Sequence, residues 1–340
     1  MRRRGAVIGK GVRLGPLSVF ECGKVILGEG CCIGPLTRFK VRGTLEFGND
    51  VKIGYLTRIN AAAVKLADET ILCSNVQVQG DRRCSVLATG PRCYVGDSCV
   101  IDLFNPVTLG EEVGIGGFSR LYTHGSWQSE LDGFPIASAE ARVGDFSWIG
   151  AGATILAGSE IGDYATVGGG TVMRRRVPSY AMATGNPGKV VLQNGGHLVH
   201  VPAEDRFNLC RRMVLEVADH QDWMDGKVET EESEDSCRVT SGEGVLMFRR
   251  RFSGVEKVNA VISFERMSDA LILEFEAAGI DWFDMDRRRC SRGMTGLSPL
   301  IRGIFSNHGV RFQTTPRGGI SGAADKKRGC KPGAPGEVIS

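Results

Sequence analysis

Residues 143–173 read VGDFSWIGAGATILAGSEIGDYATVGGGTVM, and an apolar residue recurs in this stretch at every sixth position. An α-helix places its apolar residues at intervals of three, four and seven, so a helix does not produce this period. Because six is an even number, every sixth residue of an extended chain points to the same side, as a strand requires. The stretch therefore predicts short β-strands with inward-facing anchors at Val143, Ile149, Ile155, Ile161, Val167 and Met173.

The same period extends upstream, mostly in groups of three anchors, and most groups are separated by a step longer than six. A coil with three sides needs three inward residues and then a longer corner, so each group predicts one coil of about 18 residues, and the chain predicts roughly eight stacked coils. Glycine follows many anchors and would adopt the positive φ that a tight corner often requires. A sandwich or propeller would instead show alternation with period two and turns every 8–12 residues. The predicted fold class is mainly β, a parallel β-helix, with upstream anchors Ile8, Leu14, Phe20, Leu27, Ile33, Phe39, Phe47, Ile53, Ile59, Leu66, Leu72, Val78, Val95, Ile101, Leu109, Ile115 and Leu121.

The composition argues against several classes of protein. The 340 residues carry a net charge of +3, which is too small to indicate nucleic-acid binding. The eleven cysteines include no Cys-x-x-Cys pair, which favours reduced thiols in a reducing compartment. No apolar stretch is long enough to span a membrane, and no apolar core follows residues 2–4 to make a signal peptide. These features predict a cytoplasmic protein without a membrane or nucleic-acid partner.

The six-residue period is interrupted between Leu121 and Val143 by a segment without the repeat. Insertions in a regular solenoid are often functional loops. This one holds His124, the only histidine in the first 196 residues. A surface histidine in a polar loop is the plain alternative, and a zinc carbonic anhydrase, which needs three histidines per site, is disfavoured.

Residues 143–192 resemble the C-terminal coils of the hexapeptide-repeat acyltransferases, the group that contains galactoside, maltose and xenobiotic acetyltransferases. The recognisable motifs are Trp148-Ile149-Gly150, Val177-Pro178 and the Gly-Asn-Pro-Gly-Lys segment at 185–189. The resemblance covers about residues 5–192. It implies left-handed coils, a homotrimer, acetyl-CoA as acyl donor, no required metal, and transfer to a hydroxyl of a sugar or related small molecule. N-acylation of an amino sugar or amine, and a non-catalytic scaffold or binding module, are the alternatives.

The resemblance also implies roles for individual residues. It places the catalytic histidine at His124, as general base, although Gly125 replaces the proline that often follows. The resemblance does not name the group that orients the imidazole. The candidates are Asp102, Glu130 and a backbone carbonyl, and the two carboxylates are also candidates for substrate binding. The residues to which it maps contacts with CoA are Ala151, Gly169, Arg174, Arg175 and Lys189. Trp148 is a further candidate to line the CoA site, with a plain packing role as the alternative. The family commonly has Thr-Lys at 174–175, so this chain keeps the charge and loses the hydroxyl.

The repeat ends after Lys189, which divides the chain into a β-helix over 1–192, with a catalytic loop at 122–142, and a small α+β domain over 193–313. Two runs of three arginines, at 249–251 and 287–289, are either a site for an anionic group or a solvated basic edge. A Gly-, Pro- and Lys-rich tail at 314–340 is predicted to be disordered. The elements expected in the domain are helices at 203–223 and 297–305 and strands at 245–248, 260–264, 271–275 and 310–312, with the acidic run 229–235 as a loop.

Overall fold

The structure is a computed structural model that describes residues 5–125 and 128–315, so the predicted tail lies outside the described residues from position 316 onward. The chain forms two compact units, of which the first runs to Val199 and the second begins at His200. The sequence places this boundary after residue 192, which is where the last strand of the first unit ends. Each unit is described separately below.

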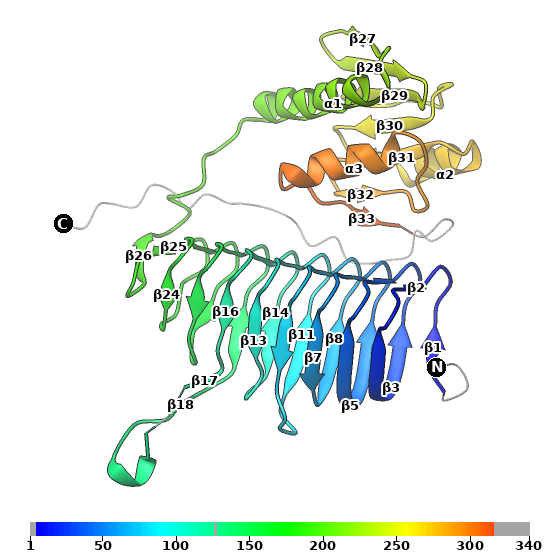
Figure 1. The fold of residues 1–340 in the computed structure, drawn as a ribbon. Helices are drawn as coiled ribbons and strands as arrows, with labels where there is room; N and C mark the ends of the chain where they lie inside the picture. The colour runs from blue at the N-terminus through cyan, green and yellow to red at the C-terminus, as the bar shows by residue number, and fades with distance from the viewer. Residues whose placement is uncertain (1–4, 126–127, 316–340) are drawn as a thin grey trace, which may run out of the picture. The chain divides into compact units, whose positions relative to one another are not determined.

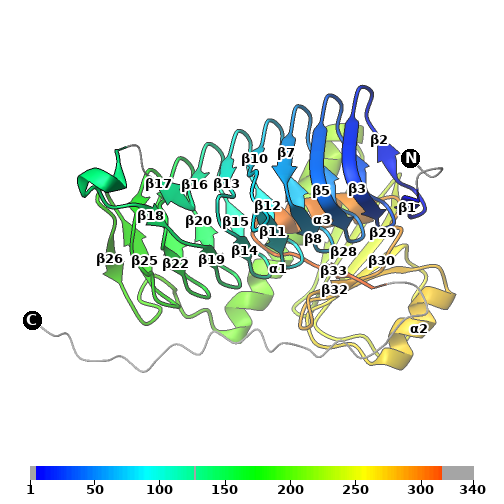
Figure 2. The same ribbon diagram turned by 90° about the horizontal axis from the view of Figure 1, so that it is seen from below.

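The first unit is a left-handed parallel β-helix with three faces, as predicted (Figure 1). Each coil contributes one short strand to each face, and strands of successive coils pair in parallel. Faces two and three merge into one sheet because the long strands β3 and β5 continue around the corner between them. Figure 2 shows the coils following one another along the axis.

The strands of each face follow from the pairing register. Face one contains β2 (Arg13–Leu14), β4 (Cys32–Ile33), β6 (Lys52–Ile53), β9 (Ile71–Leu72), β12 (Tyr94–Val95), β15 (Gly114–Ile115), β20 (Trp148–Ile149), β23 (Thr166–Val167), β25 (Met182–Thr184) and the antiparallel β26 (Lys189–Leu192). Face two contains the first halves of β3 (Val19–Leu27) and β5 (Arg38–Phe47), then β7 (Arg58–Ala61), β10 (Gln77–Gln79), β13 (Val100–Asp102), β16 (Arg120–Leu121), β21 (Thr154–Ile155) and β24 (Val172–Met173). Face three contains β1 (Val7–Ile8), the second halves of β3 and β5, β8 (Ala63–Leu66), β11 (Val86–Thr89), β14 (Val107–Leu109), β19 (Ala141–Val143) and β22 (Glu160–Ile161).

The predicted anchors form three ladders inside the prism. On face two, for example, Phe39 pairs with Ile59 and Ile59 with Val78, and all three side chains are buried. Leu14 departs from the pattern because it lies in the first coil and is 44% exposed. The ladder of face three contains a residue that an apolar pattern could not reveal, Thr89, whose hydroxyl lies 3.1 Å from that of Thr70.

The expected reason for the glycines is wrong. The glycine after Ile149, Gly150, does not have a positive φ; a Cβ added there would lie 2.4 Å from the backbone nitrogen of Gly169 on the next coil. Glycine is needed after the anchors because the coils approach closely. The left-handed corner positions between faces one and two are filled mostly by larger residues, such as Leu36 with φ 59° and Phe118 with φ 62°, a conformation uncommon for residues other than glycine.

The second unit contains a mixed sheet with helices on both faces. Cores on opposite sides of the sheet pack against α1 and α3 and against α2. The sheet order is that of the chain, and the elements are α1 (Ala203–Asp225), β27 (Glu229–Glu232), β28 (Ser236–Ser241), β29 (Gly244–Arg249), β30 (Ala260–Ser263), α2 (Asp269–Ala277), β31 (Asp281–Asp284), β32 (Arg289–Cys290), α3 (Ser298–Asn307) and β33 (Gln313–Thr314).

Several elements of this unit differ from the expectation. Residues 271–275 belong to helix α2 and not to a strand. The Ser268 side chain accepts a hydrogen bond from the Leu271 N–H at the start of the helix. The helix then buries Leu271 and Phe275, which lie one turn apart on the same side. The acidic run begins with strand β27, which pairs with β28. The last strand lies at Gln313–Thr314, just after the predicted range. Within the part of the chain that the structure describes, no helix combines the length and apolar character needed to cross a membrane.

Candidate active site

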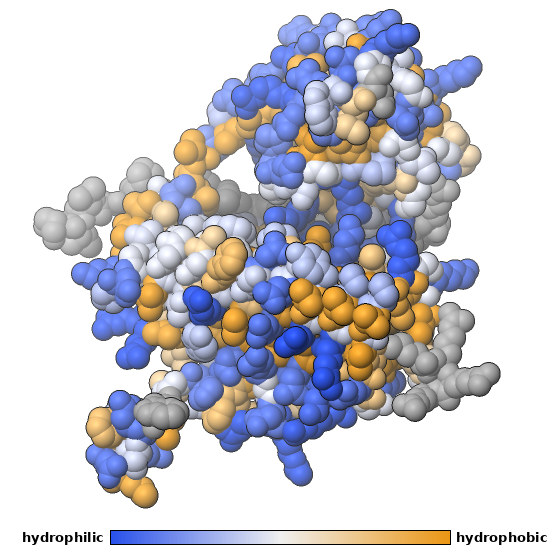
Figure 3. All heavy atoms as spheres, viewed as in Figure 1, coloured by the Kyte–Doolittle hydropathy of each residue, from blue (hydrophilic) through white to orange (hydrophobic). Residues whose placement is uncertain are grey.

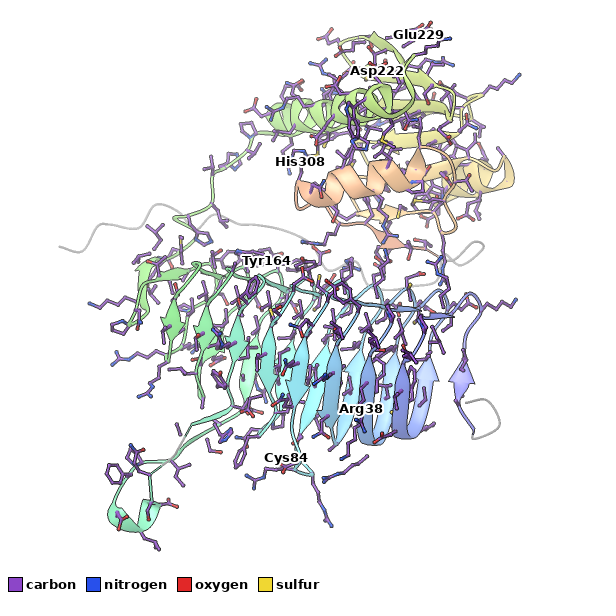
Figure 4. The ribbon with its side chains drawn as sticks, viewed as in Figure 1. Arg38, Cys84, Tyr164, Asp222, Glu229 and His308 are labelled. Atoms are coloured by element: carbon purple, nitrogen blue, oxygen red, sulfur yellow. The ribbon has the colours of Figure 1, made fainter. Side chains whose placement is uncertain are left out.

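The corner between faces two and three opens into loops on three successive coils. The loops are 80–85, 103–106 and the long segment 122–140, here called the arm, which includes β17 (His124–Gly125), a 3₁₀ turn η2 (Glu130–Asp132) and β18 (Ala137–Ser138). Two coils before loop 80–85, β5 passes the same corner as one strand. The arm projects from the lower edge of the first unit in Figure 1, and Cys84, in loop 80–85, lies on the same edge in Figure 4. Hydrophilic side chains dominate this edge in Figure 3.

His124 lies at the base of the arm, and its imidazole is held by Asp102 from the preceding coil. The distance from His124 Nδ1 to Asp102 Oδ2 is 2.8 Å, and the two side chains are 38% and 17% exposed. Because an ionised carboxylate oxygen only accepts hydrogen bonds, this contact places the proton on Nδ1. It leaves Nε2 with a lone pair that can take a proton from another molecule.

The same carboxylate is itself fixed by the backbone of the arm. Asp102 Oδ2 accepts the Thr123 N–H at 3.1 Å, and the Thr123 hydroxyl lies 3.1 Å from it. Asn105 donates its backbone N–H to the Thr123 hydroxyl at 2.9 Å and its side-chain N–H to the Thr123 carbonyl at 3.0 Å. Both the carboxylate and the chain that carries the imidazole are therefore positioned by hydrogen bonds.

One face of the imidazole is covered by an aromatic ring that the sequence did not identify. Phe104 stacks on His124 with ring centroids 4.3 Å apart and an angle of 19° between the planes. The guanidinium of Arg82 lies 4.1 Å from the centroid of the same phenyl ring. Three successive loops thus contribute one member each to a stack of Arg82, Phe104 and His124. A break in the period at residues 80–85, between the anchors Val78 and Val95, was the signal available in the sequence.

Glu130, the other carboxylate considered for orienting His124, is the first residue of η2 and is exposed. Among residues 5–125 and 128–315, the contact to the His124 ring nitrogen comes from Asp102 and not from Glu130. The two strands of the arm, β17 and β18, pair antiparallel with His124 opposite Ser138, so the arm returns to the prism beside His124.

Two of the residues mapped to CoA contacts lie together at the corner between faces one and two. Ala151 and Gly169 occupy equivalent positions on adjacent coils, and the Gly170 N–H donates to the Ala151 carbonyl at 2.9 Å. Both are exposed, and Gly117 stands at the same position one coil earlier. This corner is therefore a strip of small residues with an open backbone.

Trp148 points outward from face one, on the strand that leads into that corner. It pairs with Gly114, and a Cβ on Gly114 would lie 2.5 Å from the indole ring. The glycine thus lets the indole lie flat on the face while 42% of the residue stays exposed.

The three basic residues predicted for the phosphate side are all exposed but not grouped. Arg174 and Arg175 follow β24 at the corner between faces two and three. Lys189 is the first residue of β26. The residue before it, Gly188, donates its N–H to the Val172 carbonyl at 2.8 Å, and Val172 begins β24 at the opposite end of face two from Arg174 and Arg175. Arg176 follows them in the sequence, and its Nε lies 3.6 Å from Glu160 Oε2.

His124 and the strip at Ala151 and Gly169 also lie at opposite ends of face two. In the coil that carries His124, β16 (Arg120–Leu121) separates the two corners. About four extended residues span roughly 13 Å. Within one chain, the imidazole and this strip of small residues are thus not adjacent.

Four arginines of the two runs in the second unit pair with carboxylates. Arg249 pairs with Glu256, Arg251 pairs with Glu265, and Arg250 donates to Asp235 and Glu204 at 2.8 Å each. Arg287 donates to Asp269 at 2.7 Å. This pairing favours the reading of 249–251 as a neutralised polar edge over an anion site.

Comparisons with known proteins agree with the repeat. The family model described as bacterial transferase hexapeptide (six repeats) matches residues 140–175. The dTDP-3-amino-3,6-dideoxy-α-D-galactopyranose 3-N-acetyltransferase of Aneurinibacillus thermoaerophilus is 52% identical over 42 residues, covering 12% of this chain and 22% of that protein. The bifunctional protein GlmU of Stenotrophomonas maltophilia is 29% identical over 191 residues, covering 52% of this chain and 37% of that protein.

A solved structure, that of the polySia-specific acetyltransferase NeuO, is 20% identical with a TM-score of 0.36, and covers 55% of this chain and 86% of that one. This likeness is too low to support an argument about function. The chain spans about a fifth and just over a third of the two curated relatives named above. The matching family model and the register of the coils show that residues 140–175 carry bacterial transferase hexapeptide repeats, and in this repeat the chain is similar to the hexapeptide-repeat acyltransferases.

Proposed function

We propose that the protein is an acyl-CoA-dependent acyltransferase that moves an acetyl group from acetyl-CoA to a hydroxyl of a sugar or related small molecule. The observation that carries the proposal is the contact of His124 Nδ1 with Asp102 Oδ2 at 2.8 Å, at the corner where the regular repeat opens. A general base requires an imidazole that is held through one nitrogen and has the other nitrogen free, and the contact of His124 with Asp102 supplies that arrangement.

The chemistry assigned to His124 is proton transfer. His124 Nε2 takes the proton of the acceptor hydroxyl as its oxygen forms a bond to the thioester carbonyl carbon. The carbon–sulfur bond then breaks, and the proton on Nε2 passes to the departing thiolate. Asp102 stabilises the imidazolium that exists between these steps. Atoms and charge balance without a covalent enzyme intermediate.

The residues proposed to hold CoA fit its chemistry. The strip at Ala151 and Gly169 exposes backbone groups that can hydrogen-bond the amides of a pantetheine arm. Trp148 offers an exposed indole beside the strip. The cations assigned to the phosphates are Arg174, Arg175 and Lys189, and in the described part of the chain none of the three has a carboxylate partner.

A homotrimer is part of the proposal. Because His124 and the strip lie at opposite ends of face two, a site that contains both requires the base of one copy and the strip of another. A cytoplasmic location is also proposed; it is supported by the ten cysteines within the described residues, all of which are free thiols.

An amine acceptor is the second candidate. It is favoured by the relative from Aneurinibacillus thermoaerophilus, which is described as an N-acetyltransferase. The base arrangement serves either nucleophile, so the two candidates are separated by assay.

The proposed function is tested with the full chain and acetyl-CoA. We expect acetyl-CoA to raise the melting temperature, and free thiol to appear when a hydroxyl-bearing sugar is added. A panel of sugars, amino sugars and amines then shows whether oxygen or nitrogen is acylated. Absence of both thermal protection and thiol release at millimolar acetyl-CoA would contradict the enzyme assignment.

The role of Asp102 gives a specific prediction. Asp102→Asn should lower kcat by about 10- to 100-fold, because an amide no longer favours the tautomer with the proton on Nδ1 and stabilises imidazolium poorly. KM for acetyl-CoA should change little, since Asp102 lies outside the proposed CoA strip. Glu130→Gln is the matched control and should keep normal kcat; equal losses in the two variants would assign no special role to Asp102.

A further inference from the structure

We infer that the acceptor carries an anionic group, a carboxylate or a phosphate, and that Arg82 binds it. The inference rests on the proposed function and deepens it by naming the chemical class of the acceptor. It begins from the stack of Arg82, Phe104 and His124, which connects a cation to the imidazole through one aromatic ring.

The stack fixes where the guanidinium lies. Arg82 lies 4.1 Å from the Phe104 centroid, and Phe104 lies 4.3 Å from His124. A guanidinium held over an aromatic face keeps its N–H groups in the outward plane, where they can form two parallel bonds to a carboxylate or phosphate. The span of two stacking distances suits one sugar unit, with its reacting hydroxyl at Nε2 and its anionic substituent at Arg82.

The charges around Arg82 favour an anion. Arg82 and Arg83 are exposed, and neither has a carboxylate partner among the residues that the structure describes. Arg42, also exposed, donates to the backbone carbonyl of Asp81 at 2.7 Å and so adds a third cation to loop 80–85. Asp81 is the one acidic residue of that loop, and Asp102 is already bound to His124. This differs from residues 249–251, where each arginine faces a carboxylate.

The neighbouring strands supply groups that suit sugar hydroxyls. On face two, Gln79 pairs with Asp102 on one side and with Asn60 on the other, and the Gln79 amide donates to Gln77 Oε1 at 3.0 Å. Amide side chains both donate and accept, as hydroxyl recognition requires. These residues and Arg82 come from coils before His124, whereas Ala151, Gly169 and Arg174 come from coils after it. The acceptor is therefore assigned to the N-terminal side of His124 and CoA to the C-terminal side.

The inference is tested by binding, so that it does not depend on turnover. Calorimetry on the full chain would compare glucuronic acid with glucose, and glucose 6-phosphate with glucose. We expect at least one anionic sugar to bind about tenfold or more tightly than glucose, as a charge-assisted contact predicts. Arg82→Gln should remove that difference and leave glucose binding and CoA binding unchanged. Arg83→Gln, one residue away and outside the stack, is the matched control.

Each result has a defined consequence. Equal binding of the charged and neutral sugars, or no detectable binding of either anionic sugar at about 10 mM, overturns the inference. So does an Arg82→Gln variant that loses CoA affinity instead, because Arg82 would then bind the donor. The proposed function is tested separately by thiol release from acetyl-CoA. If the protein acetylated only neutral sugars, the inference of an anionic acceptor would be wrong, and the proposed acyltransferase activity would stand.

Discussion

Replacing His124 with alanine is expected to lower kcat for acyl transfer by about 10²- to 10⁴-fold, the range for losing a positioned general base. The loss should be in kcat because the imidazole takes a proton during the reaction and is not among the residues proposed to hold CoA. The acetyl-CoA dissociation constant should stay within about twofold of the parent value. Rates are followed by thiol release and binding by calorimetry.

The His124 variant should keep its fold, which makes the result interpretable. His124 is partly exposed, and its contacts are with Asp102 and Phe104 at the base of the arm and not with the interior of the prism. His220→Ala, on helix α1 in the second unit, is the control and should retain full activity. If His124→Ala transferred acyl groups at the parent rate, another group would have to be the base.

Replacing Phe39 with alanine is expected to destabilise the first unit by about 3–5 kcal/mol, the usual cost of removing a phenyl ring from a core. Phe39 is 0% exposed; it stacks on Phe20 at 4.7 Å and meets Phe47 edge-on at 5.9 Å. Phe39 thus joins Phe47 on the same strand, β5, to Phe20 on the preceding coil, and the substitution removes both contacts. Because each coil of a solenoid touches only its neighbours, the loss should concentrate in the first coils.

Urea unfolding followed by circular dichroism measures the stability, and hydrogen exchange locates the loss. We expect faster exchange in β3 and β5 than in β20 or β23. Phe118→Ala is the matched control, since Phe118 lies on a corner and is 65% exposed; its stability should change by less than about 0.5 kcal/mol. Equal effects of the two substitutions would mean that the ring at position 39 is not part of a tightly packed interior.

The sequence predicted the interior of the first unit well for a physical reason. Side chains in a strand alternate in direction, and each coil repeats the same three turns, so a period of six marks inward residues such as Ile53 and Val95 without knowledge of the fold. Thr89 was not among the predicted anchors because it is polar. It can be buried because its hydroxyl forms a hydrogen bond with that of Thr70 on the neighbouring coil. The second unit was predicted less well: the apolar run 271–275 carries no period long enough to distinguish strand from helix, and the Ser268 cap decides it.

What the sequence by itself determined is the period, the break that contains His124, and the basic character of 174–175. What only the tertiary structure decided is which side chains meet at the break. Asp102, Phe104 and Arg82 reach the same corner as His124 because parallel coils stack in register, so residues about twenty positions apart in the chain become neighbours. Loop lengths of six, four and nineteen residues at that corner have no period, and the direction of a side chain in an irregular loop depends on contacts from other coils. The same stacking places the strip at Ala151 and Gly169 at the opposite end of face two from His124, and this separation does not follow from the positions of these residues in the sequence.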